Sequence, residues 1–163
     1  MGSHHFAELH AHSYFTFLEG ADAPEDYVSS AQKLDLSALA LLEVDGMYSL
    51  IRALQAAKES SFPLLIGSEL TLDAGQFSRY QSPKEPAKGW GLPKGWEDRG
   101  IRLPILTTSA QGYRDLCHLM SEYTLTHDAQ ERPAHGLGNI AQMGDIRILT
   151  GGSRGPLRRV LHA

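Results

Sequence analysis

The chain of 163 residues contains a single cysteine, Cys117, no excess of basic residues and no long apolar run. One cysteine excludes an internal disulfide bond and is typical of a reducing cytosol. No run approaches the roughly 20 apolar residues of a membrane span, and no signal-peptide pattern opens the chain, so we expect a cytoplasmic protein without a membrane segment. With 15 Lys and Arg against 19 Asp and Glu, the chain has no overall positive field that would hold nucleic acid by itself.

Internal repeats and low-complexity tracts are also absent, and the length fits one domain. A hydrophobic content of 42% and a charged content of 21% are ordinary for a globular protein. Residues 1–5 end in two histidines and are interpreted either as a natural start or as a tag remnant. His4 and His5 are therefore left out of the site argument, and the domain is placed at residues 6–163.

Short apolar runs alternate with segments of helical periodicity between residue 6 and about residue 125. We predict strands over 6–9, 36–42, 62–72, 101–106 and 145–152. A capping residue, Asp22, and an early proline, Pro24, predict a helix start, and further helices are predicted over 47–57 and 112–125. This alternation predicts an α/β fold with parallel strands.

Each predicted helix has an apolar face. The expected faces are Tyr27, Val28, Ala31 and Leu34 in the first helix, Met47, Leu50, Ile51, Leu54 and Ala57 in the second, and Tyr113, Leu116, Cys117, Met120 and Tyr123 in the third.

Two stretches, 74–100 and 127–144, show no clear period and are predicted to be long loops. Pro104 inside the strand predicted over 101–106 suggests a sheet edge or a bulge. The chain stops within a predicted helix and its strand–helix units do not close. We therefore expect part of a barrel whose complete form has about 250 residues.

Several polar side chains follow the predicted strands, where the loops of a parallel sheet converge. His10 and His12 follow the first strand, Glu43 and Asp45 the second, and Glu69 ends the third. Two imidazoles two residues apart on a strand point the same way, and with carboxylates beside them they could hold zinc, manganese or iron. Taken alone, each has a simpler interpretation: an exposed His-x-His pair, a loop carboxylate at Glu43 and a helix N-cap at Asp45.

Five segments together carry a family resemblance: ELHAHSYFTFLEGADAPEDYVSSAQKLDLSALAL, DGMYSLIRALQAAKE, LLIGSELTL, GYRDLCHL and ILTGGSRGPLRR. In this order they resemble the PHP (polymerase and histidinol phosphatase) domain at the N-terminus of bacterial C-family DNA polymerases, and most closely the error-prone branch. The resemblance covers nearly the whole chain outside 74–99 and 127–144. It implies a partial, distorted TIM-like (β/α) barrel of the PHP type with parallel strands.

In active relatives, the resemblance implies up to three metal ions at the strand ends, which hydrolyse a small phosphoester or the 3′ end of DNA. His10 and His12 match the first motif, Glu69 matches the family's glutamate, and Glu19 is a weaker match to an aspartate. Three ligand positions are lost: they hold Val44, Arg102 and Gly152. Glu43, Asp45 and Arg102 are then expected to line a degenerate site, in which the fixed charge of Arg102 would oppose a metal.

Three functions remain open. The first is the PHP domain, or a fragment of it, of an error-prone DNA polymerase acting in replication or translesion repair. It would be mainly structural, would contact the remaining polymerase domains and through them DNA, and would hold one metal ion at most, with partial occupancy. The second is an active metal-dependent phosphoesterase or 3′–5′ exonuclease. The third is a degenerate relative that binds a phosphate or a protein through Arg147, Arg154, Arg158 and Arg159, although these fit a solvated helix face as well.

Overall fold

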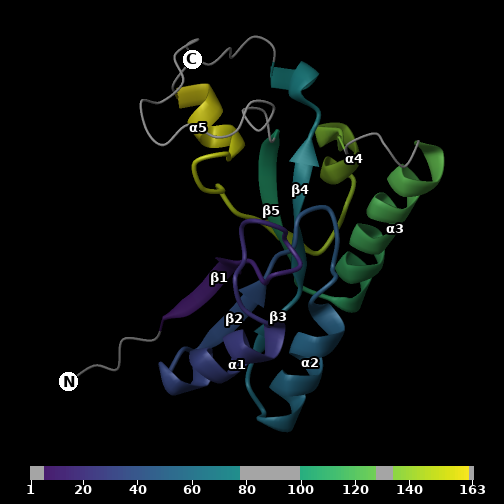
Figure 1. Ribbon diagram of the computed structural model, residues 1–163. Helices are drawn as coiled ribbons and strands as arrows, with labels where there is room; N and C mark the ends of the chain where they lie inside the picture. The colour runs from purple at the N-terminus through teal and green to yellow at the C-terminus, as the bar shows by residue number, and fades with distance from the viewer. Residues whose placement is uncertain (1–5, 78–99, 128–133, 162–163) are drawn as a thin grey trace.

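The computed structural model describes residues 6–77, 100–127 and 134–161, which form two three-stranded sheets with helices packed on them (Figure 1). In the first sheet β1 (Ala7–Ala11), β2 (Ala38–Leu41) and β3 (Leu64–Leu65) are parallel and lie in that order. In the second, β5 (Ile101–Thr107) lies between β4 (Gly67–Leu72) and β6 (Ile146–Ile148) and is antiparallel to both. The predicted α/β class is confirmed, and parallel strands are confirmed for the first sheet, whereas the second sheet is antiparallel.

The described strands do not close into a barrel, so the predicted TIM-like barrel is not confirmed. The expectations for residues 1–5, for most of the loop at 74–100 and for the start of the loop at 127–144 fall on 1–5, 78–99 and 128–133, which lie outside the described residues. The described part of the second predicted loop contains a short helix, α4 (Leu137–Ala141), so this part is not loop.

One run of apolar residues, predicted as a single strand over 62–72, divides between the two sheets. The break is at Ile66, whose carbonyl accepts a hydrogen bond from the Thr107 amide at 2.8 Å. After the break, Glu69 pairs with the chain beyond β2. Its amide donates to the Glu43 carbonyl at 3.0 Å, and its carbonyl accepts from the Asp45 amide at 2.9 Å. The two sheets are thus joined where the candidate site residues lie.

Two helices cover the parallel sheet: α1 (Pro24–Lys33) and α2 (Leu50–Glu59), which lie side by side at the bottom of Figure 1. The core between them and the sheet consists of Val28, Ala31, Leu39, Leu41, Ala53 and Ala57. Two details of the prediction are wrong. The N-cap of α1 is Ala23 and not Asp22, and Leu34, Ile51 and Leu54 are exposed rather than on the buried faces. Small alanines let the two helices approach the sheet closely, which turns the longer side chains outward.

The antiparallel sheet has its own core, formed with α3 (Ala110–Thr126). The Ser109 hydroxyl caps α3 by accepting from the amides of Gln111 and Gly112. The predicted face of α3 is correct for Leu116, which is fully buried, and the structure adds Leu119. The remaining helices are η1 (Ala74–Phe77) and α5 (Pro156–Leu161).

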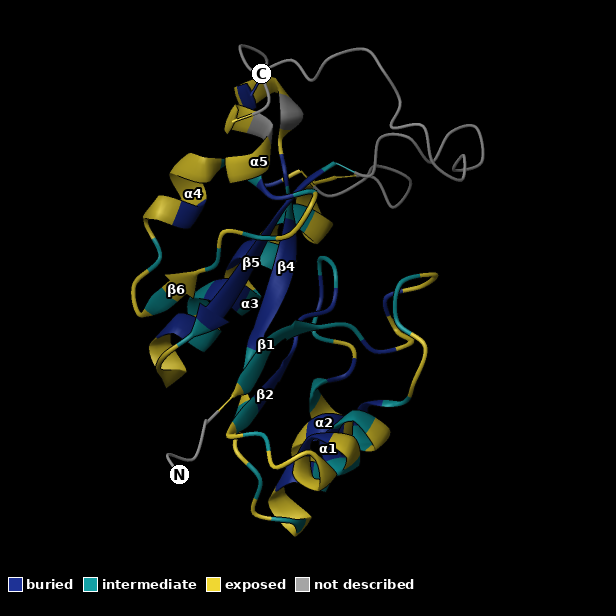
Figure 2. Cartoon of the chain, turned by 90° about the vertical axis from the view of Figure 1, so that its left-hand side faces the viewer, coloured by how far each residue is buried: buried dark blue, intermediate teal, exposed yellow. Residues whose placement is uncertain are grey.

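Pro104 is in the central strand of this sheet and is fully buried, so the prediction of an edge or a bulge is wrong. Its carbonyl accepts from the Leu149 amide at 3.0 Å, which keeps the strand pairing without the missing proline donor. Figure 2 shows the consequence of this packing: β4 and β5 are largely buried, whereas the outer sides of α1 and α2 are exposed. None of the helices in the described ranges is long and apolar enough to span a bilayer.

Candidate metal centre

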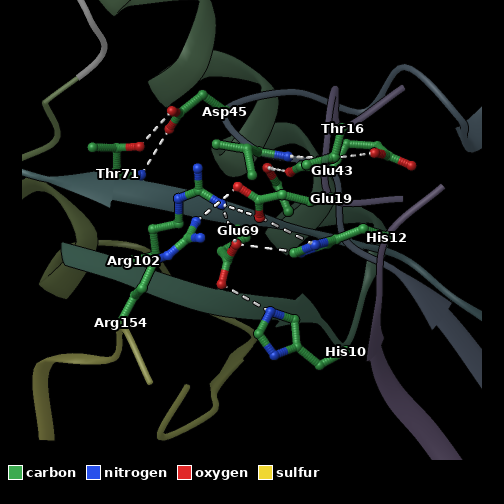
Figure 3. Close-up of polar contacts among 12 residues, drawn as sticks. His10, His12, Thr16, Glu19, Glu43, Asp45, Glu69, Thr71, Arg102 and Arg154 are labelled. Carbon is green, nitrogen blue, oxygen red and sulfur yellow. Dashed lines mark hydrogen bonds and ion pairs between the residues drawn. The ribbon is translucent and has the colours of Figure 1, made fainter. Parts of the chain in front are cut away.

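Three potential metal ligands converge where β1 meets β4 (Figure 3). One ligand atom from each of His10, His12 and Glu69 lies within 4.8 Å of the other two. His10 is in β1 rather than after it, His12 directly follows β1, and Glu69 is in the middle of β4 rather than at its end. Glu69 reaches the histidines because its backbone pairs with residues 43–45 at the junction of the sheets.

The two imidazoles lie at either side of one carboxylate. His10 Nε2 is 2.8 Å from Glu69 Oε1, and His12 Nε2 is 3.3 Å from Glu69 Oε2. The rings stand edge to face with their centroids 5.2 Å apart, as expected for alternate residues on one side of a strand. Buried His12 Nε2 meets no hydrogen-bond geometry within the described ranges, although it lies in ion-pair contact with Glu69 Oε2.

A guanidinium group occupies the other side of the same carboxylate. Arg102 Nη1 lies 3.3 Å from Glu69 Oε2 and 2.7 Å from Glu19 Oε2, and the arginine is buried. Glu19 Oε1 is in turn 2.7 Å from Nη1 of Arg154. The Arg102 amide donates to the Arg154 carbonyl at 3.0 Å, so backbone and side chains hold the two arginines together. Two carboxylates are therefore neutralised by two arginines of the chain itself.

Glu43 holds the loop that carries His12 and Glu19 in place through hydrogen bonds. The carboxyl oxygens of this fully buried residue accept from the amide and hydroxyl of Ser13 and from the hydroxyl of Thr16. Glu43 thus does not belong to the ligand cluster. It positions the loop between the ligand His12 and the arginine partner Glu19.

Asp45 is not a helix cap, because α2 begins five residues later with Ser49 as its N-cap. The Asp45 carboxylate instead accepts from the Thr71 amide at 2.7 Å and from the Thr71 hydroxyl at 2.6 Å. Burial raises the pKa of Asp45, and the Thr71 hydrogen bonds oppose this rise. The sequence alone did not single out Thr71 or its role.

Buried His135, which sequence reasoning missed, places its Nε2 3.7 Å from Asp45 Oδ1. Burial lowers the pKa of the His135 imidazole, and the charge of His127 adds to the effect. Because this residue lies in a polar stretch without periodicity, no pattern in the sequence marked it as buried.

The positions interpreted as lost ligands differ in their surroundings. Val44 forms a parallel bridge with Glu69 and so lies beside the cluster, but it offers no donor atom. Gly152 is exposed, and a β-carbon there would meet nothing within 4 Å. Of the four C-terminal arginines, Arg154 pairs with Glu19, Arg147 donates to the Ile146 carbonyl and Arg158 is exposed, while the Arg159 side chain lies outside the described part of the structure.

The electrostatics of Glu69 follow from these contacts. Burial opposes its charged form, but hydrogen bonds and charges from His10 and His12 outweigh burial and lower the pKa of Glu69 from 4.5 to about 2. The carboxylate is therefore ionised at neutral pH, as a metal ligand or an arginine partner must be.

We expect this shift to appear as acid sensitivity. Because the folded pKa lies below the unfolded value, the stabilisation is complete above pH 4.5 and is lost as the pH falls towards 2. A shift of this size corresponds to about 3 kcal/mol in the free energy of unfolding. Urea unfolding of the wild type and of Glu69→Gln between pH 2 and 7 measures it. The difference between the two should shrink below pH 4.5, and a constant difference would contradict the assignment.

The donor set fits one ion. Two imidazoles and one carboxylate suit zinc, manganese or iron. A second ion has no comparable set, since the described residues contain no other group of three such donors. Arg102 already lies on Glu69, so a metal would have to share this carboxylate with a guanidinium.

Comparison with known proteins agrees with these sequence motifs. The model of the PHP domain matches residues 8–163. The chain belongs to the PHP domain family. It is 35% identical over 159 residues to an error-prone DNA polymerase of Cutibacterium acnes, and 40% identical over 116 residues to one of Anaeromyxobacter sp. strain K. The predicted family is therefore confirmed.

This PHP domain covers only a small part of those relatives. The match takes in 96% of the chain but 13% of the Cutibacterium polymerase, and 71% of the chain but 8% of the Anaeromyxobacter polymerase. A crystal structure from Bifidobacterium adolescentis, described only provisionally as a metal-dependent phosphoesterase, matches with a TM-score of 0.47 and 18% identity over 76% of this chain and 34% of that one.

Proposed function

We propose that the chain is the PHP domain, or part of it, of an error-prone DNA polymerase, and that its role there is mainly structural. It supports the remaining domains of a cytoplasmic polymerase and meets DNA through them. Its metal site is eroded and holds at most one divalent ion, through His10, His12 and Glu69. The curated relatives of similar sequence are error-prone polymerases, which is why this parent protein is favoured.

One observation carries the proposal: the buried guanidinium of Arg102 contacts both Glu19 and Glu69. In a multinuclear hydrolytic site, these carboxylates would face metal ions. Here Arg102 and Arg154 supply the positive charge. Their contacts join the loop after β1, strands β4 and β5 and the segment before α5 without a metal ion. In this arrangement, ion pairs between side chains join the segments that metal ions would join in a multinuclear site.

When bound, a divalent ion would polarise a phosphoryl oxygen and lower the pKa of a water molecule. His10, His12 and Glu69 would hold it, and Arg102 would orient Glu69. The described residues contain no second group of three such donors that would hold another ion against the leaving oxygen. On this basis we expect weak phosphoester hydrolysis or none.

Metal content tests the proposal directly. Purified protein should bind at most one zinc or manganese ion per chain, measured by mass spectrometry of metals and by titration with Co²⁺ followed through its absorption. His12→Ala should weaken Co²⁺ binding by more than the roughly 10- to 100-fold that loss of an outer-shell partner costs, because it removes one of the three ligands themselves. The control is His118→Ala, which changes an exposed histidine on α3. Two or more tightly bound ions would contradict an eroded site.

An active phosphoesterase or 3′–5′ exonuclease is the second candidate, and the observation in its favour is the convergence of one ligand atom each from His10, His12 and Glu69. A generic phosphoester and a primer with a mismatched 3′ end distinguish the two functions. Metal-dependent turnover that disappears in His12→Ala would establish the enzyme and reject the structural role.

A further inference from the structure

The backbone pairing that joins the two sheets at the candidate site is short. Val44 and Glu69 form an isolated parallel bridge with two hydrogen bonds, from the Glu69 amide to the Glu43 carbonyl and from the Asp45 amide to the Glu69 carbonyl. A slip of one residue in such a pairing turns every side chain of the strand to the opposite face. The Glu69 carboxylate would then point away from the ligand histidines, so its place depends on what holds this register.

Asp45 adds two hydrogen bonds to this pairing through its side chain (Figure 3). Its carboxylate accepts from the Thr71 amide at 2.7 Å and from the Thr71 hydroxyl at 2.6 Å. Thr71 follows Glu69 by two residues in β4, so the two side chains lie on one face of the strand. The backbone of Asp45 thus holds Glu69 while its carboxylate holds Thr71, and a slip would break these hydrogen bonds together.

The course of the chain explains why a side chain takes this place. Asp45 has a φ of +51°, in the left-handed region that aspartate tolerates better than most residues, and the chain turns there. Further along the same edge of β4, the His135 amide donates to the Thr71 carbonyl at 2.8 Å and the Asp73 amide donates to the His135 carbonyl at 3.1 Å. The Asp45 carboxylate therefore serves the Thr71 amide between two segments that pair through their backbones.

The second hydrogen bond of the carboxylate goes beyond what the Thr71 amide requires. One acceptor atom satisfies an amide, but here the other carboxylate oxygen accepts from the Thr71 hydroxyl. Thr71 lies opposite Arg102 in the pairing of β4 with β5, and the Arg102 guanidinium contacts Glu69. Asp45 is therefore connected to the face of β4 on which the site is built, and not only to its edge.

We propose that Asp45 is a positioning residue, which locks the register of β4 against residues 43–45 and thereby places the Glu69 carboxylate between the two ligand histidines. The inference deepens the proposed function and rests on it in taking His10, His12 and Glu69 as the site of one metal ion. It does not depend on the identity of the parent polymerase. Without the lock, the imidazoles lose their carboxylate partner and an ion loses one of its three ligands.

Four variants test the lock. Asp45→Gly removes the carboxylate at a positive φ that glycine adopts freely. Asp45→Asn should retain the lock, because its side-chain oxygen can accept from the Thr71 amide while its amino group donates to the Thr71 hydroxyl. Thr71→Val removes one of the two hydrogen bonds. Leu119→Ala is the control for lower stability alone, since it opens a cavity in the core beside α3 and leaves the lock in place.

Two measurements on the purified protein report where Glu69 lies. The first is the imidazole ¹H–¹⁵N NMR spectrum with a chelator present, and the second is titration with Co²⁺. In Asp45→Gly the signals of His10 and His12 should move, and the Kd for Co²⁺ should rise about tenfold or more, as expected when a metal ligand loses an outer-shell partner. Thr71→Val should show smaller changes. Asp45→Asn and Leu119→Ala should match the wild type in both measurements.

Three results would overturn the lock. The first is unchanged imidazole signals in Asp45→Gly, and the second is an equal change in Leu119→Ala, which would show a general loosening of the fold. The third is an Asp45→Asn variant that behaves like Asp45→Gly, because the effect would then come from charge and not from hydrogen bonds. If Asp45→Gly does not fold, Thr71→Val and its conservative rescue Thr71→Ser make the same comparison.

Failure of the proposed function would look different. Two or more ions bound to the wild type would reject the eroded site, yet the imidazole signals of the variants would still decide on the lock. The same signals decide it when the wild type binds no Co²⁺, since they are recorded without metal.

Discussion

Arg102→Met should lower the free energy of unfolding by about 3–5 kcal/mol in metal-free buffer, because it takes the buried guanidinium away from the Glu69 and Glu19 carboxylates. Methionine keeps much of the arginine volume, so the loss reports the charge rather than a cavity. Urea unfolding at pH 7 with a chelator measures it. Zinc or manganese should then recover part of the lost stability, since Glu69 becomes available to an ion beside His10 and His12.

Arg52→Met is the matched control. Arg52 also pairs with a glutamate, Glu25, but their side chains are 44% and 41% exposed, so its loss should cost less than about 1 kcal/mol. Arg102→Met as stable as the wild type in chelator would show that the arginine does not replace a metal. Strong stabilisation of the wild type by added metal would also show that the arginine does not replace a metal.

Glu43→Ala should destabilise the protein by about 4 kcal/mol, since it creates a cavity and leaves the buried donors of Ser13 and Thr16 without an acceptor. Glu43→Gln keeps the volume and one acceptor oxygen and should cost about half as much. Both variants should also weaken Co²⁺ binding, because the loop that holds His12 loses its anchor. Thermal and urea unfolding, together with the Co²⁺ titration, measure the two effects.

The control for this anchor is Glu59→Ala, which removes an exposed carboxylate at the end of α2 and should change stability by less than about 0.5 kcal/mol. If Glu43→Ala lowered stability while Co²⁺ affinity stayed unchanged, Glu43 would support the fold without positioning His12. If Glu43→Ala changed neither the stability nor the Co²⁺ affinity, water would have replaced the carboxylate as the partner of Ser13 and Thr16.

Much of the local structure could be predicted because it depends on local patterns. The apolar spacing around Leu116 is enough to locate α3, and the run around Leu39 and Ala40 is buried as a strand covered on both faces. The errors occur where contacts between residues far apart in the sequence decide which side chains are buried. Ile51 has the spacing of a buried residue, but Ala53 and Ala57 take the buried side of α2 and leave Ile51 in solvent.

The candidate site shows the same division. The sequence determined the family, the His10 and His12 pair and the absence of a histidine at Val44, since these depend only on residue type and spacing. It could not determine what Arg102 does, because the partners of its charge lie 33 and 83 residues away along the chain.

Only the tertiary structure decided that the chain's own arginines neutralise the carboxylates of this site. The strand break at Ile66 brings Glu69 to the residues beyond β2, and the antiparallel sheet brings Arg102 to Glu69 from the adjacent strand. Charge pairing acts through space, and its strength depends on burial and on distances of a few ångströms. Residue types and spacing specify the donors, whereas the fold specifies which charges they meet.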